Sequence, residues 1–295
     1  MDKYELLYQN YKKRIGSIIP DHIASKSEFE ARFSSDLEKM SLIVLGERSL
    51  DEGFLHYALW KDDIAHCYVP VYGYYAASEK AAVKLFQKLA DTVLKGGACD
   101  FSINIYRSDH DTLTAFHMMQ FGNMSERCIK TLESGQISAN PFEIKALGKD
   151  EIEKNWHSIW KATESIINHL KGSPIFYPGS EFTESVYRDY FMSDSLELIA
   201  AYENGTLAGI IEWNTENCEL IGNDELSVNA GEAFVYPQYR KTGLARQLLC
   251  FAQTRAMASG YKYMWVEHGT ANPNARGFWN KYFETYQYEL VRRIG

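Results

Sequence analysis

The sequence lacks paired cysteines and long hydrophobic runs. Five cysteines occur among 295 residues, and no two of them form a C-x-x-C pair, which excludes a disulfide framework and a zinc ribbon. The cysteines are Cys67, Cys99, Cys128, Cys218 and Cys250. No run of about 18 uncharged apolar residues is present, and the first residues have no apolar signal-peptide core. We therefore expect a cytoplasmic protein with reduced cysteines, no membrane span and no membrane partner.

Positive charge is also scarce. The chain has 31 Lys and Arg against 39 Asp and Glu, a formal net charge of -8. Such a molecule repels phosphate backbones, so nucleic acid is excluded as the first choice of partner, whereas a cationic small molecule is permitted. The eight histidines form no H-x-x-x-H motif and no His/Cys cluster, so we expect no metal site. No G-x-S-x-G, P-loop or G-x-G-x-x-G motif occurs, which disfavours serine hydrolase, ATP and dinucleotide sites.

The predicted elements occur twice in the same order. At roughly 150 residues per domain, the length suggests two domains. In the first half we predict three antiparallel strands, a helix and a strand at 42–45, 54–60, 64–75, 78–93 and 101–106. In the second half we predict the same sequence of elements at 196–202, 207–213, a strand ending at 235, 244–258 and 263–266, with a closing strand at 286–292. We therefore predict an α/β (α+β) chain whose domains, 1–137 and 138–295, are diverged copies of one fold.

One segment carries a clear chemical signal. The run from Arg240 to Ala245, Arg-Lys-Thr-Gly-Leu-Ala, joins a predicted strand directly to a predicted helix. Free N–H groups and the positive end of the helix dipole meet at such a junction, which favours phosphate. Gly243 and Ala245 allow close approach of an anion, and Arg240 and Lys241 add positive charge.

This segment resembles the pyrophosphate loop of the GNAT family of acyl-CoA N-acyltransferases, [RQ]-x-x-G-x-[GA]. Arg240-x-x-Gly243-x-Ala245 matches it, after the run Val235-Tyr-Pro-Gln-Tyr-Arg240. Downstream, the stretch from Asn272 to Phe283 resembles the family's N-x-x-A-x-x-F-[YW] helix. The resemblance covers about residues 140–295.

The resemblance implies two GNAT-like domains, each a mixed, mostly antiparallel sheet flanked by helices. In the C-terminal domain it implies a splayed central strand pair with acetyl-CoA in the gap. Val235 would pair with the pantetheine arm, and Asn272 would support the cofactor unless it only caps its helix. The loop residues implied to hold the pyrophosphate are Arg240, Lys241, Thr242, Gly243, Leu244 and Ala245.

The catalytic residues are less well defined by sequence. Glu232 lies where the family often places a base-like carboxylate, and it is our candidate general base, the alternative being a solvent-facing carboxylate. Glu267 and His268 are further candidates for the base. At the position where many members have a tyrosine acid this chain has Trp279, which has no proton to give at neutral pH. Its substitutes are Tyr282, Tyr286 or Tyr288, or the chain has no acid.

The first half lacks the loop. Its strand-to-helix connection contains no basic residue and presents Glu79 where the second half has Arg240. We therefore interpret 1–137 as a degenerate GNAT-like domain without cofactor, the alternative being an unrelated α/β domain. Tyr72, Tyr74 and Tyr75 of this connection either line a substrate cleft or pack within a sheet.

These observations predict an N-acetyltransferase that moves an acetyl group from acetyl-CoA to a primary amine of a small molecule. The alternative is a non-catalytic acyl-CoA-binding sensor or assembly module, which Trp279 favours. A protein N-acetyltransferase would need a peptide groove, of which the sequence gives no sign.

Overall fold

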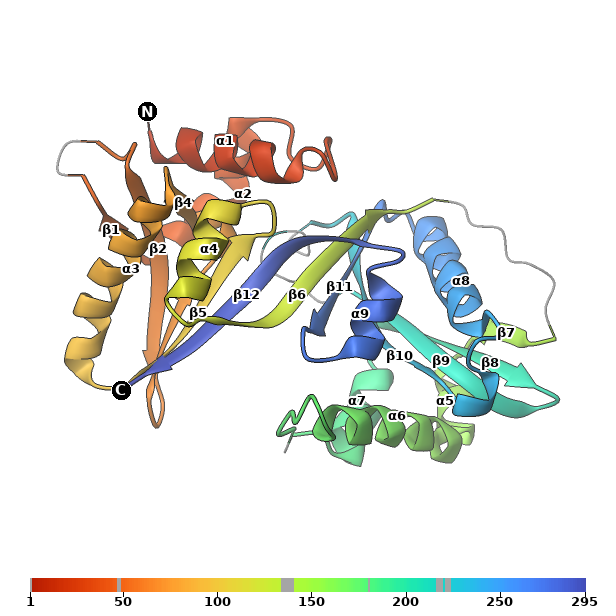
Figure 1. Ribbon diagram of the computed structural model, residues 1–295. Coiled ribbons are helices and arrows are strands. Elements are labelled where there is room, and N and C mark those ends of the chain that lie inside the picture. Colours follow the sequence, from red (N-terminus) through yellow and green to blue (C-terminus); the bar gives the residue numbers. More distant parts are fainter. Residues whose placement is uncertain (1, 47–48, 134–140, 180, 216–219, 221–223) are drawn as a thin grey trace. The chain divides into compact units, whose positions relative to one another are not determined.

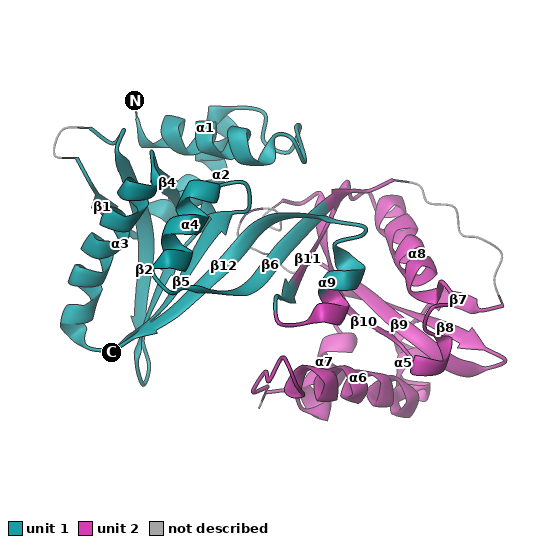
Figure 2. Ribbon diagram, viewed as in Figure 1, with its two compact units in different colours: residues 1–129, 268–270, 276–295 teal, residues 130–267, 271–275 magenta. Residues whose placement is uncertain are grey.

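The computed structural model (Figure 1) describes residues 2–46, 49–133, 141–179, 181–215, 220 and 224–295. The chain forms two compact units, coloured separately in Figure 2. Unit 1 comprises residues 1–129, 268–270 and 276–295, and unit 2 comprises residues 130–267 and 271–275. The predicted boundary between residues 137 and 138 lies outside the described residues.

Unit 1 is a mixed sheet with helices. Its strands run in the order β1-β2-β3-β5-β12-β6, and β4 also pairs with β2. All these pairs are antiparallel except β3 with β5. The strands are β1 (Ser41–Val44), β2 (Gly53–Lys61), β3 (Ala65–Val69), β4 (Tyr74–Ala76), β5 (Cys99–Tyr106), β6 (Gly122–Thr131) and β12 (Glu284–Ile294). The helices are α1 (Lys3–Ile15), α2 (Lys26–Glu38), α3 (Glu79–Val93) and α4 (His110–Met118).

Unit 2 has a sheet of the order β11-β10-β9-β8-β7, in which only the β10–β11 pair is parallel. Its strands are β7 (Glu143–Ala146), β8 (Leu196–Glu203), β9 (Thr206–Asn214), β10 (Ser227–Val235) and β11 (Tyr263–Gly269). Its helices are α5 (Lys149–Lys154), α6 (Trp156–Lys171), α7 (Glu184–Phe191), α8 (Leu244–Ala258) and α9 (Pro273–Trp279), the last of which ends in unit 1. The predicted mixed, mostly antiparallel sheets flanked by helices are confirmed.

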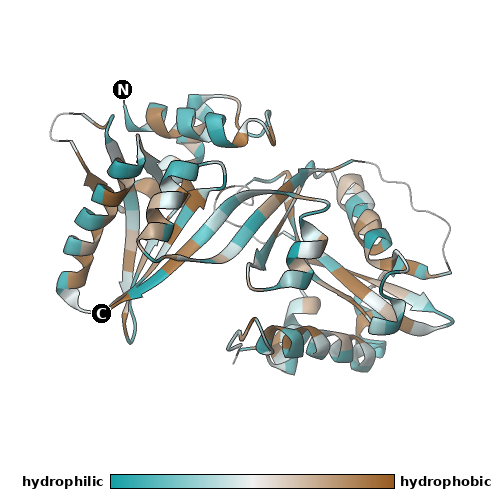
Figure 3. Cartoon of the chain, in the orientation of Figure 1, coloured by the Kyte–Doolittle hydropathy of each residue, from teal (hydrophilic) through white to brown (hydrophobic). Residues whose placement is uncertain are grey.

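Each unit has its own core. In unit 1, Leu85, Phe86 and Leu89 of α3 pack with strand residues such as Phe101 and Ile103. In unit 2, residues of α6 and α7 pack with the inward residues of β8 and β9, and α8 packs on β8, β9 and β10. Figure 3 shows that single helices carry both hydrophobic and hydrophilic residues, as expected when one face of a helix covers a sheet. In the part of the chain that the structure describes, no helix combines the length and the apolar character that crossing a membrane requires.

Two predicted elements differ from the structure. The strand predicted at 64–75 is wrong as a single strand, because β3 stops before Pro70, which cannot donate to a ladder. A short 3-10 helix follows, and β4 then pairs with β2. The closing strand predicted at 286–292 exists, but as β12 it pairs with β5 and β6 in unit 1, although it had been expected in the second domain.

Candidate functional site

The strands β10 and β11 pair only at their beginning. Their parallel register runs from Ser227 with Tyr263 to Asn229 with Trp265, and β10 then continues to Val235 without β11. On its other side, β10 stays paired with β9 up to Val235, with a bulge between Ala230 and Ala233. Beyond Asn229, the edge of β10 that faces β11 therefore has no partner strand among the described residues.

A tight loop connects β10 to α8. A 3-10 turn at Pro237–Tyr239 is followed by Lys241 at φ 66° and Gly243 at φ 90°, both in the left-handed region. Left-handed residues alternating with right-handed ones turn successive N–H groups toward one side, which forms an anion-binding nest. In the described part of the chain, no N–H group of residues 241–246 makes a hydrogen bond. The loop predicted to bind pyrophosphate thus offers free donors at a helix N-terminus.

Gly243 is the N-cap of α8, and no side chain caps this end of the helix. A Cβ built on Gly243 would meet no atom within 4 Å, so the space in front of the helix is open. Leu244 begins the helix as a buried residue, whereas Ala245 is half-buried. The fit to a diphosphate therefore rests on backbone donors, an open approach and the dipole of α8.

The side chains of the loop hold its shape. Arg240 Nε donates to the carbonyl of Val235 at 3.0 Å, and its guanidinium lies 5.9 Å from the centre of the Phe234 ring. Thr242 Oγ1 donates to the carbonyl of Tyr239 at 2.7 Å. Lys241 is exposed. Arg240 therefore links the loop to the end of β10, a contact that its expected role toward phosphate did not include.

Asn272 precedes α9 and is buried. Its Oδ1 accepts the N–H of Ala275 at 3.1 Å, which is an N-cap bond, and lies 3.1 Å from His169 Nε2. The capping role considered from the sequence is thus present, and the role toward a cofactor stays a prediction.

Glu232 lies in the β10 bulge, where pairing with β11 has ended. Its Oε1 accepts the hydroxyl proton of Tyr187 at 2.9 Å, and its N–H donates to Glu212 Oε1 at 2.9 Å. Burial raises the pKa of Glu232 above its ordinary value, and the hydrogen bond from Tyr187 opposes this effect. Its second oxygen, Oε2, has no hydrogen-bond partner among the described residues. The geometry provides an oriented carboxylate with raised basicity and one free oxygen.

The helix α7 and the role of Glu212 were not predicted from the sequence. The helix α7 presents Tyr187 to Glu232 and Tyr190 to Glu212. Its signal was present in the sequence, because Val186, Tyr187, Tyr190 and Phe191 follow the helical spacing of three and four after the capping Thr183. Glu212 gave no such signal, since a single glutamate in an apolar strand does not reveal its neighbours.

The other catalytic candidates are placed elsewhere. Glu267 is exposed, and His268 is buried, with Nε2 3.2 Å from Asn280 Oδ1. Trp279 is buried and packs on Phe278 and Phe283 within unit 1. The substitute tyrosines also belong to unit 1: Tyr282, Tyr286 and Tyr288.

A cluster of possible metal ligands in unit 1 is joined by hydrogen bonds. Glu126, Cys128 and His268 are buried with ligand atoms within 4.8 Å of one another. The amide of Asn280 contacts all three side chains, with Oδ1 at 3.2 Å from His268 Nε2 and 3.6 Å from Cys128 Sγ, and with Nδ2 donating to Glu126 Oε1 at 3.4 Å. Burial raises the pKa of the Cys128 thiol to about 12, so this cysteine stays protonated and inert at neutral pH.

In unit 1, the connection that leads into α3 ends in a helix start that a side chain caps. Ser78 caps α3, and its side chain accepts the N–H of Ala81 at 3.2 Å. Glu79 follows in the first turn and is exposed. The strand β3 pairs with β5 along its whole length, and Asn104 of β5 donates to the carbonyl of Val69 at the end of β3. Tyr72 and Tyr74 are buried, so both tyrosines pack within the unit.

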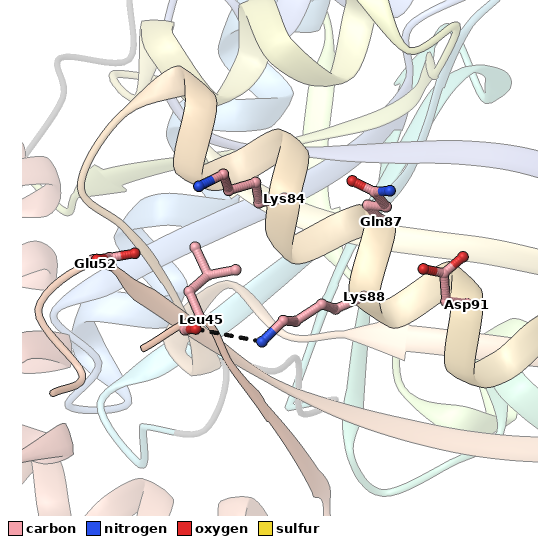
Figure 4. A pocket seen from close by; sticks show the side chains of 6 residues that line it. All are labelled: Leu45, Glu52, Lys84, Gln87, Lys88 and Asp91. Carbon is pink, nitrogen blue, oxygen red and sulfur yellow. Dashed lines mark hydrogen bonds between the residues drawn. The ribbon is translucent and has the colours of Figure 1, made fainter. Parts of the chain in front are cut away.

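Unit 1 also has a hollow beside α3 (Figure 4). Its lining mixes charges of both signs: Leu45, Glu52, Lys84, Gln87, Lys88 and Asp91. Lys88 Nζ donates to the carbonyl of Val44 at 3.0 Å and to that of Leu45 at 3.3 Å, the second bond being drawn in Figure 4. Four of the lining residues lie on α3, and Leu45 and Glu52 lie just after β1 and just before β2, so the hollow does not correspond to the open helix N-terminus of unit 2.

The chain is similar to known proteins in part of its sequence and in its fold. Residues 163–284 match the acetyltransferase (GNAT) family. A GCN5-related N-acetyltransferase from Sphaerobacter thermophilus has a similar structure, with a TM-score of 0.54 and 13% identity over 92% of this chain and 85% of that one. A conserved protein of unknown function from Staphylococcus epidermidis gives a TM-score of 0.50 at 9% identity, over 88% of this chain and 96% of that one.

A tandem GNAT protein from the clavulanic acid biosynthesis pathway gives a TM-score of 0.48 at 11% identity, over 99% of this chain and 95% of that one. No curated protein matches the sequence. At these identities the first two structures show a shared fold, and the family match covers residues 163–284.

Proposed function

We propose that the second unit is an N-acetyltransferase that moves an acetyl group from acetyl-CoA to a primary amine of a small molecule, because residues 163–284 match the acetyltransferase (GNAT) family. The observation that carries the proposal is that β10 bears a half-buried, oriented carboxylate in its bulge and leads directly into the loop whose N–H groups are free. Acetyl-CoA, when bound, supplies an acyl thioester. The residues of the chain bind the cofactor and remove the proton of the amine.

The backbone of residues 241–246 holds the diphosphate in this proposal. Its free N–H groups and the dipole of α8 favour a doubly charged anion, and Lys241 adds a positive charge. The unpaired edge of β10 after Asn229 offers backbone groups to an extended amide-bearing arm. We place the cofactor in unit 2 alone.

Glu232 removes the proton of the amine. An ammonium is not a nucleophile, so a base must accept its proton before acyl transfer. Glu232 has one oxygen held by Tyr187 and one oxygen available to the amine or to a water. Its raised pKa makes it a stronger proton acceptor than an exposed glutamate.

The alternative is a non-catalytic acyl-CoA sensor or assembly module. It is favoured by Trp279, which replaces the expected tyrosine acid and is buried in unit 1. Acetyl-CoA turnover, measured as free thiol against a panel of small amines, separates the two functions. Thiol release that depends on an amine supports the enzyme, and binding without release supports the sensor.

The variant Glu232→Gln tests the base. It keeps the side-chain shape, so we expect unchanged acetyl-CoA affinity and a kcat lower by about 10²–10⁴-fold near neutral pH. The wild-type rate should fall as the pH drops through the raised pKa of Glu232, because the protonated form accepts no proton. This acidic limb should vanish in the variant, and its rate deficit should shrink at high pH, where amines deprotonate unaided.

The matched control is Glu197→Gln on strand β8, which β9 separates from β10; the Glu197 carboxylate accepts from Trp213 Nε1 at 2.9 Å. We expect this control to retain the wild-type rate. A normal rate of Glu232→Gln near neutrality would show that Glu232 is a structural carboxylate.

A further inference from the structure

Glu212 is a wholly buried carboxyl group next to the proposed base. It lies on β9 with 0% of its surface exposed. Three donors point at it: Tyr190 Oη at 2.8 Å, Asn214 Nδ2 at 3.2 Å and the N–H of Glu232 at 2.9 Å. An apolar residue at this position would leave these three donors without their acceptor, which is costly for buried groups.

The bulge explains why the backbone N–H of Glu232 needs a side-chain acceptor. A β-bulge leaves one residue of the bulged strand without its ladder bond. Here the register of β10 on β9 shifts between Ala230 and Ala233, and the N–H of Glu232 within the bulge bonds to Glu212 in place of a backbone carbonyl. Glu212 thus replaces the missing strand partner of the residue that presents the proposed base.

Gly231 makes room for this carboxyl group. A Cβ on Gly231 would lie 1.7 Å from Glu212 Oε1, well inside contact distance. Any other residue at 231 would therefore displace either the carboxyl group or the bulge. Close approach, not backbone conformation, requires glycine here.

The helix α7 donates one hydrogen bond to each of the two glutamates. Tyr187 and Tyr190 lie one turn apart on α7, and each donates its hydroxyl proton to one of the two glutamates. The side chain of Glu232 is held by α7 and its backbone by Glu212. Its two anchors therefore come from different elements.

We propose that Glu212 is a positioning residue for Glu232: it fixes the β10 bulge and thereby aims the proposed base at the end of the β10–β11 pairing. The inference rests on the proposed function, because it assigns Glu232 as the base. Glu212 acts as a hydrogen-bond acceptor, which does not require its charge. Burial raises its pKa to about 8, in keeping with an uncharged role at neutral pH.

The first test compares two replacements of Glu212. Glu212→Gln keeps an acceptor oxygen, whereas Glu212→Leu fills the space without one. We expect Glu212→Leu to lower kcat roughly 10- to 100-fold, since a displacement of about 1 Å at a reacting group costs up to this factor. Glu212→Gln should restore most of the rate, and acetyl-CoA affinity should stay unchanged in both. Glu197→Gln serves again as the control without contact to Glu232.

Gly231→Ala disturbs the contact between Glu212 and the bulge from the side of β10. It provides the test if Glu212→Leu does not fold. It leaves Glu212 in place but pushes its carboxyl group away from the bulge, so kcat should fall as in Glu212→Leu. The double variant of Gly231→Ala and Glu232→Gln then tests whether the loss of kcat acts through Glu232. If Glu212 acts through Glu232, the double variant is no slower than Glu232→Gln alone.

The outcomes separate the two proposals. A slow Glu232→Gln together with a wild-type rate of Gly231→Ala and Glu212→Leu overturns the role of Glu212 and leaves the base intact. Losses that multiply in the double variant also overturn it, because they show an effect independent of Glu232. A wild-type rate of Glu232→Gln overturns both the base and its positioning residue.

Discussion

At the scale of the residue, backbone conformation carries the candidate cofactor site. The N–H groups of the loop are free because Lys241 and Gly243 adopt left-handed φ angles that turn them outward. A side chain at Gly243 would bring strain, because L residues pay about 1–2 kcal/mol in this region, and it would also stand in the open approach to the helix end.

We expect Gly243→Glu to abolish acetyl-CoA binding. The carboxylate would add negative charge to the site and its stem would cover the N–H donors. Gly260→Glu is the matched control: Gly260 lies just beyond the other end of α8 at φ 96°, and a Cβ there also meets nothing within 4 Å. Titration calorimetry should show no binding for the first variant and wild-type affinity for the second. Equal affinity of a folded Gly243→Glu would remove the loop from the site.

At the scale of the element, the two strand-to-helix junctions differ in their caps. Ser78 satisfies an N–H at the start of α3, whereas Gly243 offers no side chain to α8. A capped helix start has fewer donors for an anion. The last strand, β12, follows α9 in the sequence but pairs with β5 and β6 in the sheet of unit 1.

This pairing predicts where a core substitution in β12 acts. Leu290 is fully buried in the core of unit 1, so Leu290→Ala should cost about 2–5 kcal/mol of stability. Hydrogen exchange should speed up in β5 and β6, whereas β8 and β9 should keep their protection. Leu248→Ala on α8 of unit 2 should give the reverse pattern. Faster exchange confined to unit 2 in Leu290→Ala would contradict this assignment.

At the scale of the whole molecule, one fold occurs in two units that differ at the candidate site. Unit 1 has β3 paired along its whole length and an acidic, capped α3, whereas unit 2 has a strand that leaves its partner and an uncapped α8. The same chain order of elements therefore does not imply the same ligand.

We predict a stoichiometry of one acetyl-CoA per chain. Glu79 and the Ser78 cap should exclude a diphosphate from unit 1, and the nest in unit 2 should hold one. Titration calorimetry measures the number directly, and Gly243→Glu should bring it to zero. Two equivalent sites in the wild-type chain would show that unit 1 binds cofactor as well.

Local sequence determined most of the elements and the candidate cofactor loop. Alternating strands, helix periodicity and the Asn204-Gly205 turn are local signals, and α8 was predicted with its observed limits, Leu244–Ala258. The loop from Arg240 to Ala245 is also local, since a strand, a glycine and a helix start within a few residues produce the nest.

Only the tertiary structure decided the surroundings of Glu232 and the place of β12. The hydrogen bonds from Tyr187 to Glu232 and from Tyr190 to Glu212 span 45 and 22 residues, and no local pattern encodes them. Likewise, β12 has the alternation of a strand, but alternation states which face is buried and not which edge it joins. Pairing partners and the bonds of a buried carboxyl group depend on residues that only the folded chain brings together.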